Sequence, residues 1–307
     1  MLKRGTILYS IFATLGEVGI LKIDACTNQA IAGLSLKEDS NILKEYLYYY
    51  LKSKKKDVNN LGRGVAQNNI NLSLLRKFKI PVIPLCQQKK IIEVLDNVSS
   101  IINNYERELA LLDELVKARF VEMFGDPVSN SKDLPVQKMN NVAPICQYDG
   151  SFEESVWLLN LDMVESQTGR IINYNIVSKD EIGGSVCTFD ENNVLYSKLR
   201  PYLNKVVIPD GKGYATSELV PLRPDPKIIN RIYLAYLLRS NEFVEMIKEK
   251  VAGAKMPRVS MSDFREFNVP VPLLELQNQF ASFVQEIDKS RLLELLAIKH
   301  IKSLLKD

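Results

Sequence analysis

Apolar side chains recur at alternating steps of four and three residues from Ile91 to Val116, with no break in the pattern. Most residues between them are charged or carry amides. A 3.5-residue repeat keeps one narrow stripe of a helix against one partner helix, as in a coiled coil. The pattern therefore predicts a helix about 39 Å long, since each residue adds ~1.5 Å. Its seam positions are Ile91, Leu95, Val98, Ile102, Tyr105, Leu109, Leu112 and Val116.

A second stretch of the same chain repeats this pattern and predicts the partner helix. FKIPVIPLCQQKKI at 78–91 aligns with FNVPVPLLELQNQF at 267–280, which places Pro81 opposite Pro270, 189 positions later. Two similar stripes in one chain most simply bury each other, and the long segment between them favours an antiparallel pair. Arg291 and Glu294 interrupt the second stripe, and they either set the register or face a wet opening. The second seam is Phe280, Val284, Ile287, Ile298, Ile301 and Leu305.

The repeat extends upstream of both helices. GRGVAQNNINLSLLRKF at 62–78 aligns with VAGAKMPRVSMSDFREF at 251–267, and ILYSIF at 7–12 aligns with VLYSKL at 194–199, now 187 positions later. The chain therefore consists of two copies of one unit, each a globular part followed by a long helix. Residue 188 falls opposite Met1, so we expect the first copy to lack a counterpart of residues 128–187, about 60 residues.

Short β-branched runs separated by Gly, Asp and Asn predict strands in both globular parts, and each part also contains one predicted helix, at 42–56 and 228–251. Gly125 and Pro127 should end the first long helix. We expect a mixed α+β fold with two globular parts, two long helices and a pseudo-twofold repeat. The predicted boundaries are 1–85 for a truncated first domain, 86–127 for the first helix, 128–273 for the second domain and 274–307 for the second helix.

Composition narrows the class of protein. The 307 residues suit about two domains, at ~150 residues each. No apolar run approaches the ~18 residues of a membrane span, and the first residues lack a signal-peptide pattern, so we expect a cytoplasmic protein without membrane contact. The four cysteines are scattered and form no CxxC, which argues against a zinc site or a disulfide framework. The net charge of +3 permits nucleic-acid binding without requiring it.

Catalytic chemistry finds little support in the sequence. The single histidine, His300, lies on the second predicted helix, so no Ser–His or Cys–His pair can be assembled with confidence. GxGxxG, P-loop and HExxH motifs are absent. We therefore expect a non-enzymatic chain with no catalytic residues, no metal and no cofactor.

Two kinds of segment are candidates for DNA contact, because arginine, glutamine and asparagine pair with base edges and lysine with phosphates. One is the glycine-containing loop that occurs in both copies. A polar surface turn explains each loop alone, but its repetition favours a shared role. The candidates in these loops are Arg63, Gln67, Asn68 and Asn69, and in the second copy Lys255 and Arg258.

The other candidate is YSKLRPYLNKV at 196–206, where basic residues alternate with aromatics and amides. A DNA-facing edge and an edge strand guarded by lysine explain this stretch about equally well. The lysines at 52 and 54–56 are better explained as a solvated helix end than as phosphate ligands. The candidates in 196–206 are Lys198, Arg200, Tyr202, Asn204 and Lys205.

The duplicated order of these segments, together with FVEMFGDP at 120–127, resembles the specificity subunit of type I restriction–modification systems, over essentially the whole chain. The resemblance implies two target-recognition domains joined by an antiparallel coiled coil, each reading half of a bipartite site in double-stranded DNA. It also implies that the helices set the spacing and dock methyltransferase subunits, and it leaves open whether the restriction subunit, an endonuclease and translocase, binds too. The alternative is a coiled-coil adaptor that bridges protein partners without touching DNA.

Overall fold

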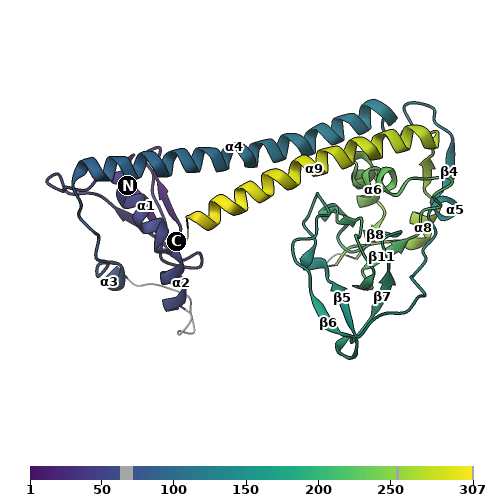
Figure 1. The fold of residues 1–307 in the computed structure, drawn as a ribbon, viewed down its shortest axis with the longest axis horizontal. Coiled ribbons are helices and arrows are strands. Elements are labelled where there is room, and N and C mark those ends of the chain that lie inside the picture. Colours follow the sequence, from purple (N-terminus) through teal and green to yellow (C-terminus); the bar gives the residue numbers. More distant parts are fainter. Residues whose placement is uncertain (63–71, 254–255, 306–307) are drawn as a thin grey trace. The chain divides into compact units, whose positions relative to one another are not determined.

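The computed structural model describes residues 1–62, 72–253 and 256–305. The chain divides into two compact units, one formed by residues 1–106 with 300–307 and the other by residues 107–299. Two long helices, α4 (Leu85–Phe124) and α9 (Leu274–Leu304), each contribute residues to both units (Figure 1). No helix in the described ranges is long and apolar enough to cross a membrane.

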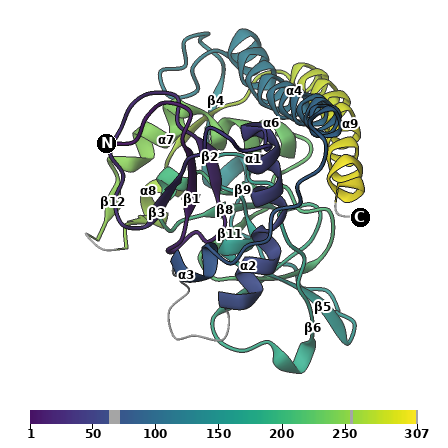
Figure 2. The same cartoon turned by 90° about the vertical axis from the view of Figure 1, so that its left-hand side faces the viewer.

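Unit 1 is built on a three-stranded antiparallel sheet of order β2-β1-β3. Ile7 and Tyr9 of the central strand are fully buried and pack with Leu47 and Leu51 of the first helix. The central strand β1 is hydrogen-bonded to a neighbour on both sides and is therefore not an edge of this sheet (Figure 2). The elements are β1 (Ile7–Ser10), β2 (Val18–Ile20), β3 (Ile31–Leu34), α1 (Lys44–Ser53), α2 (Lys55–Gly62) and α3 (Leu72–Leu75).

Unit 2 repeats this arrangement. Its three-stranded sheet has the order β11-β8-β9, so the central strand again carries the VLYS sequence that matches ILYS of unit 1. Side chains of Asn230, Ser240 and Ser260 cap the three helices that follow by accepting bonds from free N–H groups of the first turns. The elements are β8 (Val194–Ser197), β9 (Val206–Val207), β11 (Leu219–Leu222), α6 (Arg231–Arg239), α7 (Asn241–Lys248) and α8 (Met261–Arg265).

A second, four-stranded sheet distinguishes unit 2. Its order is β6-β5-β10-β7, with β10 parallel to β5 and antiparallel to β7. It has its own apolar core around Trp157 and Phe189. The described residues of unit 1 hold no such sheet, which agrees with the missing counterpart of residues 128–187. The strands are β5 (Ser155–Leu159), β6 (Ile176–Ser178), β7 (Val186–Phe189) and β10 (Gly213–Thr216).

Shorter elements complete unit 2. β4 pairs with β14 next to the start of α9, and β12 pairs with β13 in a hairpin. Three single 3₁₀ turns each connect two successive strands of the same sheet: β5 to β6, β6 to β7, and β8 to β9. These elements are β4 (Val136–Lys138), α5 (Met139–Val142), η1 (Leu161–Met163), η2 (Lys179–Glu181), η3 (Pro201–Leu203), β12 (Val251–Ala252), β13 (Arg258–Val259) and β14 (Asn268–Pro270).

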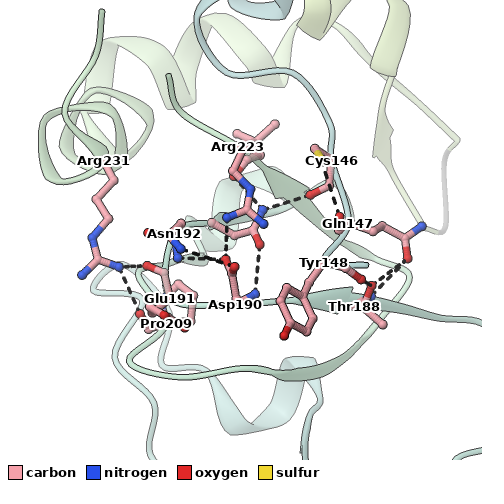
Figure 3. Close-up of polar contacts among 12 residues, drawn as sticks. Cys146, Gln147, Tyr148, Thr188, Asp190, Glu191, Asn192, Pro209, Arg223 and Arg231 are labelled. Atoms are coloured by element: carbon pink, nitrogen blue, oxygen red, sulfur yellow. Dashed lines mark hydrogen bonds and ion pairs between the residues drawn. The ribbon is translucent and has the colours of Figure 1, made fainter. Parts of the chain in front are cut away.

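The turn at residues 190–193, in which Asp190 and Asn193 are buried, joins the two sheets of unit 2 (Figure 3). Asp190, at the end of β7, accepts a 2.7 Å bond from Arg223 and holds Asn192 across the turn. Asn193 is fully buried and donates to the backbone carbonyls of Cys146 and Leu222. Because these bonds join β7 to the end of β11, they fix the angle at which the chain passes from one sheet to the other.

The two long helices run antiparallel, as predicted. Within unit 2, Phe120 packs on Phe280 with ring centroids 5.5 Å apart, whereas Asp113, earlier on α4, pairs with Arg291, later on α9. Within unit 1, the Nζ atom of Lys302 lies 3.1 Å from the Oε1 atom of Glu106. Gly125, with φ of 72°, ends α4 at the predicted position, since glycine adopts this left-handed conformation without a steric penalty.

Burial along α4 and α9 follows the two predicted stripes. Leu109 and Val116 of α4 are buried, as are Phe280, Val284 and Ile298 of α9. The end positions Ile91 and Leu305 are the exceptions, because both are exposed. Most other seam positions are half-buried, as in a two-helix pair: Leu95, Val98, Ile102, Tyr105, Leu112, Ile287 and Ile301.

The polar interruption of the second stripe borders an open cavity of unit 2, but the Arg291 side chain itself is almost fully buried. Arg291 is 8% exposed and makes ion pairs with Asp113 of α4 and Asp288 of its own helix. Nearby, a carboxylate oxygen of Glu294 is buried with no hydrogen-bond partner among the described residues. A buried charge needs a fixed partner, so the Asp113–Arg291 pair supports the alternative in which this interruption sets the register of the helices.

Candidate nucleic-acid interface

The segment after β8 contains the 3₁₀ helix η3 with a left-handed residue at each end. Arg200 and Asn204 both have φ of 49°, a conformation that is uncommon for residues other than glycine. Backbone N–H groups of Leu203 and Asn204 donate to the carbonyls of Arg200 and Pro201. This geometry leaves the side chains of Arg200 and Tyr202 exposed, while Lys198 is half-buried. We refer to residues 198–202 as the basic turn.

The basic turn pairs with the hairpin β12–β13, which contains the second candidate segment. The amide of Arg200 donates to the carbonyl of Pro257 at 2.8 Å, and the amide of Val259 donates to the carbonyl of Lys198 at 2.9 Å. Lys198, Arg200 and Arg258 therefore lie on neighbouring strands although about 60 residues of sequence separate them. The structure thus brings together two segments that the sequence identified independently.

Glu218 holds the Arg258 side chain in a fixed orientation. The guanidinium donates through Nε and Nη2 to the carboxylate, with the shortest bond at 2.7 Å. The bond from Arg258 keeps the pKa of Glu218 below its usual value, outweighing the opposing effect of burial. Because the arginine side chain is 45% exposed, a phosphate can still reach the guanidinium beside Glu218.

Asn204 and Lys205 face inward rather than outward. Asn204 is buried, and its side-chain amide donates to the carbonyl of Arg239 at 2.9 Å. The ammonium of Lys205 donates to the carbonyl of Leu161 at 2.6 Å, and burial lowers its pKa. In this conformation both side chains hold the basic turn in place and neither is positioned to contact DNA.

Five of the predicted contacts lie outside the described residues, and the structure places none of them: Arg63, Gln67, Asn68, Asn69 and Lys255.

The sequence did not point to the residues that hydrogen-bond to the backbone of the basic turn and of Leu203 next to it. The backbone N–H of Gln167 donates to the carbonyl of Leu203 at 2.9 Å, and its side-chain amide donates to the carbonyl of Tyr202 at 3.0 Å. Three residues later, Arg170 forms an ion pair with Asp113 of α4. The internal repeat could not point to this loop, because it lies in the part of the second copy that has no counterpart in the first.

Nothing in the described ranges gathers three or more histidine, cysteine, aspartate or glutamate side chains in a geometry that could hold a metal ion. The exposed side chains of the basic turn are the guanidinium of Arg200 and the ring of Tyr202, groups that suit an anionic partner.

Comparisons with known proteins agree on a family. The type I restriction modification DNA specificity domain matches residues 1–113 and 162–303, which is most of the chain. The two matched segments correspond to the two copies of the repeat.

Curated relatives show the same likeness at low identity. The chain is 27% identical over 124 residues to the type I restriction enzyme EcoDI specificity subunit of Escherichia coli, a match that covers 40% of this chain and 27% of that protein. It is 21% identical over 311 residues to the MjaIX specificity subunit of Methanocaldococcus jannaschii, covering 92% of this chain and 71% of that protein.

Two solved structures share the fold. One comes from work on complex assembly and conformational transition of the type I R-M system, with a TM-score of 0.58, 15% identity, and coverage of 99% of this chain and 80% of that chain. The other is the type I restriction–modification S subunit from M. genitalium, with a TM-score of 0.55, 15% identity, and coverage of 99% and 81%.

Proposed function

Because this chain belongs to the family of type I restriction–modification DNA specificity subunits, we propose that it selects the DNA sites of such a system through the basic turn and β13 of unit 2. The residues that contact DNA are Lys198, Arg200, Tyr202 and Arg258. The observation that carries this assignment is the pairing of the basic turn with β13, which presents three cationic side chains from two segments on one surface.

The chemistry of these side chains suits a duplex. Lys198 and Arg258 supply cations for phosphates, which fix the register of a protein on DNA without reading sequence. Arg200 is exposed and has no ion-pair partner among the described residues, so its guanidinium is free to bond a guanine edge in the major groove. Tyr202 is 41% exposed next to it and can contact a base or the sugar–phosphate backbone.

The chain acts as a non-catalytic subunit in this proposal, and its helices dock the methyltransferase subunits. Leu292, Leu293 and Leu296 of α9 are between 52% and 69% exposed, on a helix whose other face packs on α4. Contiguous exposed leucines are typical of a surface that another protein covers. Methyl transfer then occurs on the partner subunits, at adenines whose position this chain selects.

An adaptor that bridges proteins without binding DNA would use the same helices. The two functions differ in their dependence on salt, because phosphate contacts release condensed counterions. A DNA-reading subunit loses affinity steeply as salt rises, whereas an adaptor shows no duplex binding at any salt concentration.

The test uses the chain co-expressed with a type I methyltransferase subunit. Mapping of methylated adenines first identifies the site, and fluorescence anisotropy then measures affinity for that duplex across a salt series. We expect Arg200→Ala to weaken binding by about 1–3 kcal/mol if it reads a base, and Lys198→Ala to reduce the salt slope by ~1 if it contacts a phosphate.

Lys227→Ala is the matched control, because Lys227 is an exposed lysine in the turn before α6. It should leave both affinity and salt slope unchanged. Unchanged binding by both Arg200→Ala and Arg258→Ala would overturn the proposed surface, and the absence of binding to every duplex would favour the adaptor.

A further inference from the structure

We propose that Gln167 and Arg170 are positioning residues that hold the basic turn in a fixed orientation relative to α4 and α9 within unit 2, and thereby determine how strictly the turn reads its bases. This inference rests on the proposed function. It is carried by a loop, residues 165–170, that is bonded to the helix pair at one end and to the basic turn at the other.

The inner end of the loop is fixed by a shared carboxylate. Asp113 of α4 pairs through one oxygen with the guanidinium of Arg170 and through the other with Arg291 of α9, at 2.6 Å. Arg291 is almost fully buried, so one side of this arrangement cannot move freely. Bonds to a carboxylate that is already held by a buried arginine restrict Arg170 more than an isolated surface pair would.

Two backbone hydrogen bonds close the loop over its short length. The amide of Gly169 donates to the carbonyl of Glu165, and the amide of Glu165 donates to the carbonyl of Arg170. Gly169 has φ of 68°, and a Cβ atom at this position would lie 1.8 Å from the carbonyl oxygen of Val206. The loop therefore packs directly on the backbone of β9, and a displacement at Arg170 is passed on to Gln167.

The outer end of the loop binds the basic turn through backbone groups. Gln167 donates from its backbone and from its side chain to the carbonyls of Leu203 and Tyr202. Leu203 in turn donates to the carbonyl of Arg200. From Asp113 to Arg200 the connection is continuous, and none of its members belongs to the predicted DNA contacts until the turn itself is reached.

A role in positioning differs from a role in stability by what it changes. A variant that merely unfolds part of the protein reduces the active fraction and weakens binding to every duplex equally. A variant that loosens the basic turn lets Arg200 miss its base, so discrimination between sites falls while phosphate contacts persist. The informative quantity is therefore the ratio of affinities for the mapped site and for duplexes with one substituted base pair.

The experiment measures this ratio by fluorescence anisotropy for the complex with the methyltransferase subunit, together with thermal melting of each variant. Arg170→Gln and Asp113→Asn each remove the charge at the inner end. Gln167→Asn shortens the side chain at the outer end, and asparagine tolerates the φ of 70° at this position. Arg119→Gln is the matched control, because Arg119 pairs with Glu122 on the exposed side of α4.

We expect each of the three variants to lower the ratio by roughly tenfold, the size of one lost base contact. The double variant Asp113→Asn with Arg170→Gln should lose no more than Asp113→Asn alone, since that single variant already breaks the link to Arg170. Arg119→Gln should keep the full ratio.

Full discrimination by Arg170→Gln and Gln167→Asn would overturn this inference, provided that Arg200→Ala loses discrimination in the same assay; the proposed surface would then stand. An equal loss of affinity for all duplexes, in proportion to a loss of folded protein, would also overturn it. Unchanged binding by Arg200→Ala would instead remove the proposed surface, and this inference with it.

Discussion

Gln88 and Gln277 make the same three hydrogen bonds in the two units. Each is fully buried at the start of a long helix, where its carbonyl accepts from a backbone amide and its amide donates to two backbone carbonyls. The partners of Gln88 are Leu43, Asn41 and Ile83, and those of Gln277 are Asn230, Ile228 and Pro272. Each partner of Gln277 lies 187 or 189 positions after its counterpart, so the repeat in the sequence is also a repeat of interactions.

Replacing either glutamine with leucine should destabilise the unit that contains it. Gln88→Leu leaves one part-buried N–H and two part-buried carbonyls without their partner in unit 1, and Gln277→Leu removes the equivalent three bonds in unit 2. The cost of an unsatisfied buried polar group is about 1–3 kcal/mol, and we expect a loss of at least that size for each variant. Hydrogen exchange, which reports on each unit separately, is the measurement.

The neighbouring exposed residues Gln87 and Gln279 supply controls. Gln87→Leu and Gln279→Leu should change the protection of amides in either unit by less than about 0.5 kcal/mol. Equal effects of Gln277→Leu and Gln279→Leu would contradict the assigned role.

Four tyrosines give a matched test across the repeat. The hydroxyls of Tyr46 and Tyr233 donate to the carbonyls of Pro81 and Pro270, at 3.1 and 2.8 Å. Substitution of either by phenylalanine should lower the free energy of unfolding by about 1 kcal/mol, because it leaves that carbonyl without its donor.

Substitution of Tyr9 or Tyr196 by phenylalanine should change the free energy of unfolding in the opposite direction. Both hydroxyls are buried, and neither has a hydrogen-bond partner among the described residues. Burial raises the pKa of both phenols. Removing an unsatisfied hydroxyl removes its desolvation cost, so phenylalanine at either position should raise the free energy of unfolding by up to about 1 kcal/mol. A marked loss in urea denaturation would contradict this prediction.

Gly169 should tolerate no side chain. Gly169→Ala combines a positive φ with a Cβ atom inside contact distance of the Val206 carbonyl, and we expect a loss of roughly 3 kcal/mol or more. Gly183→Ala is the comparison, because a Cβ atom there meets nothing within 4 Å. The midpoints of thermal melting of the two variants should therefore differ by several degrees.

Stability of unit 2 should fall in acid through Asp190. Burial alone would raise the pKa of this carboxyl, but bonds from Arg223 and Asn192 outweigh it and hold the pKa below its ordinary value. A depressed pKa in the folded state means that the contribution is complete above pH ~4, where unfolded aspartate is ionised, and is lost as the pH falls through the folded value.

Asp190→Asn should therefore cost about 1–3 kcal/mol at pH 7, where it leaves Arg223 without its charge partner, and less at pH 3. Urea midpoints at the two pH values measure the difference. Asp180→Asn, at an exposed aspartate of η2, should behave as wild type at both. If the difference in urea midpoint between Asp190→Asn and wild type were the same at pH 7 and pH 3, the charge of Asp190 would contribute nothing to stability.

Much of the repeated framework could be predicted from the sequence, because periodicity and self-similarity report directly on it. The alternation at Leu109 and Val116 identified the buried face of α4, and the alignment of Pro81 with Pro270 located its partner. The four-stranded sheet could not be predicted in the same way. The parallel pairing of β10 with β5 joins strands more than 50 residues apart, and nothing in their alternation specifies it.

Residue type and repetition identified candidate side chains for DNA contact, but not the contacts that these side chains make in the structure. Arg200 and Arg258 were identified from residue type and repetition, and the structure brings their segments together. Asn204 was included for its amide, but a left-handed backbone turns that amide inward to Arg239. The partners of Arg170 and Arg291 were not identified, because both converge on Asp113, whose importance depends on three segments meeting in space.

The passage of the chain through β10 limits how specificity could be exchanged between relatives. The four-stranded sheet draws three strands from residues 155–189 and its fourth from residues 213–216, beyond two strands of the other sheet. A chimera that transplants only the first stretch would therefore set foreign strands on both sides of a native one. Grafting of this sheet therefore has to move residues 155–216 as one block, because a crossover between β7 and β10 would yield a mismatched sheet.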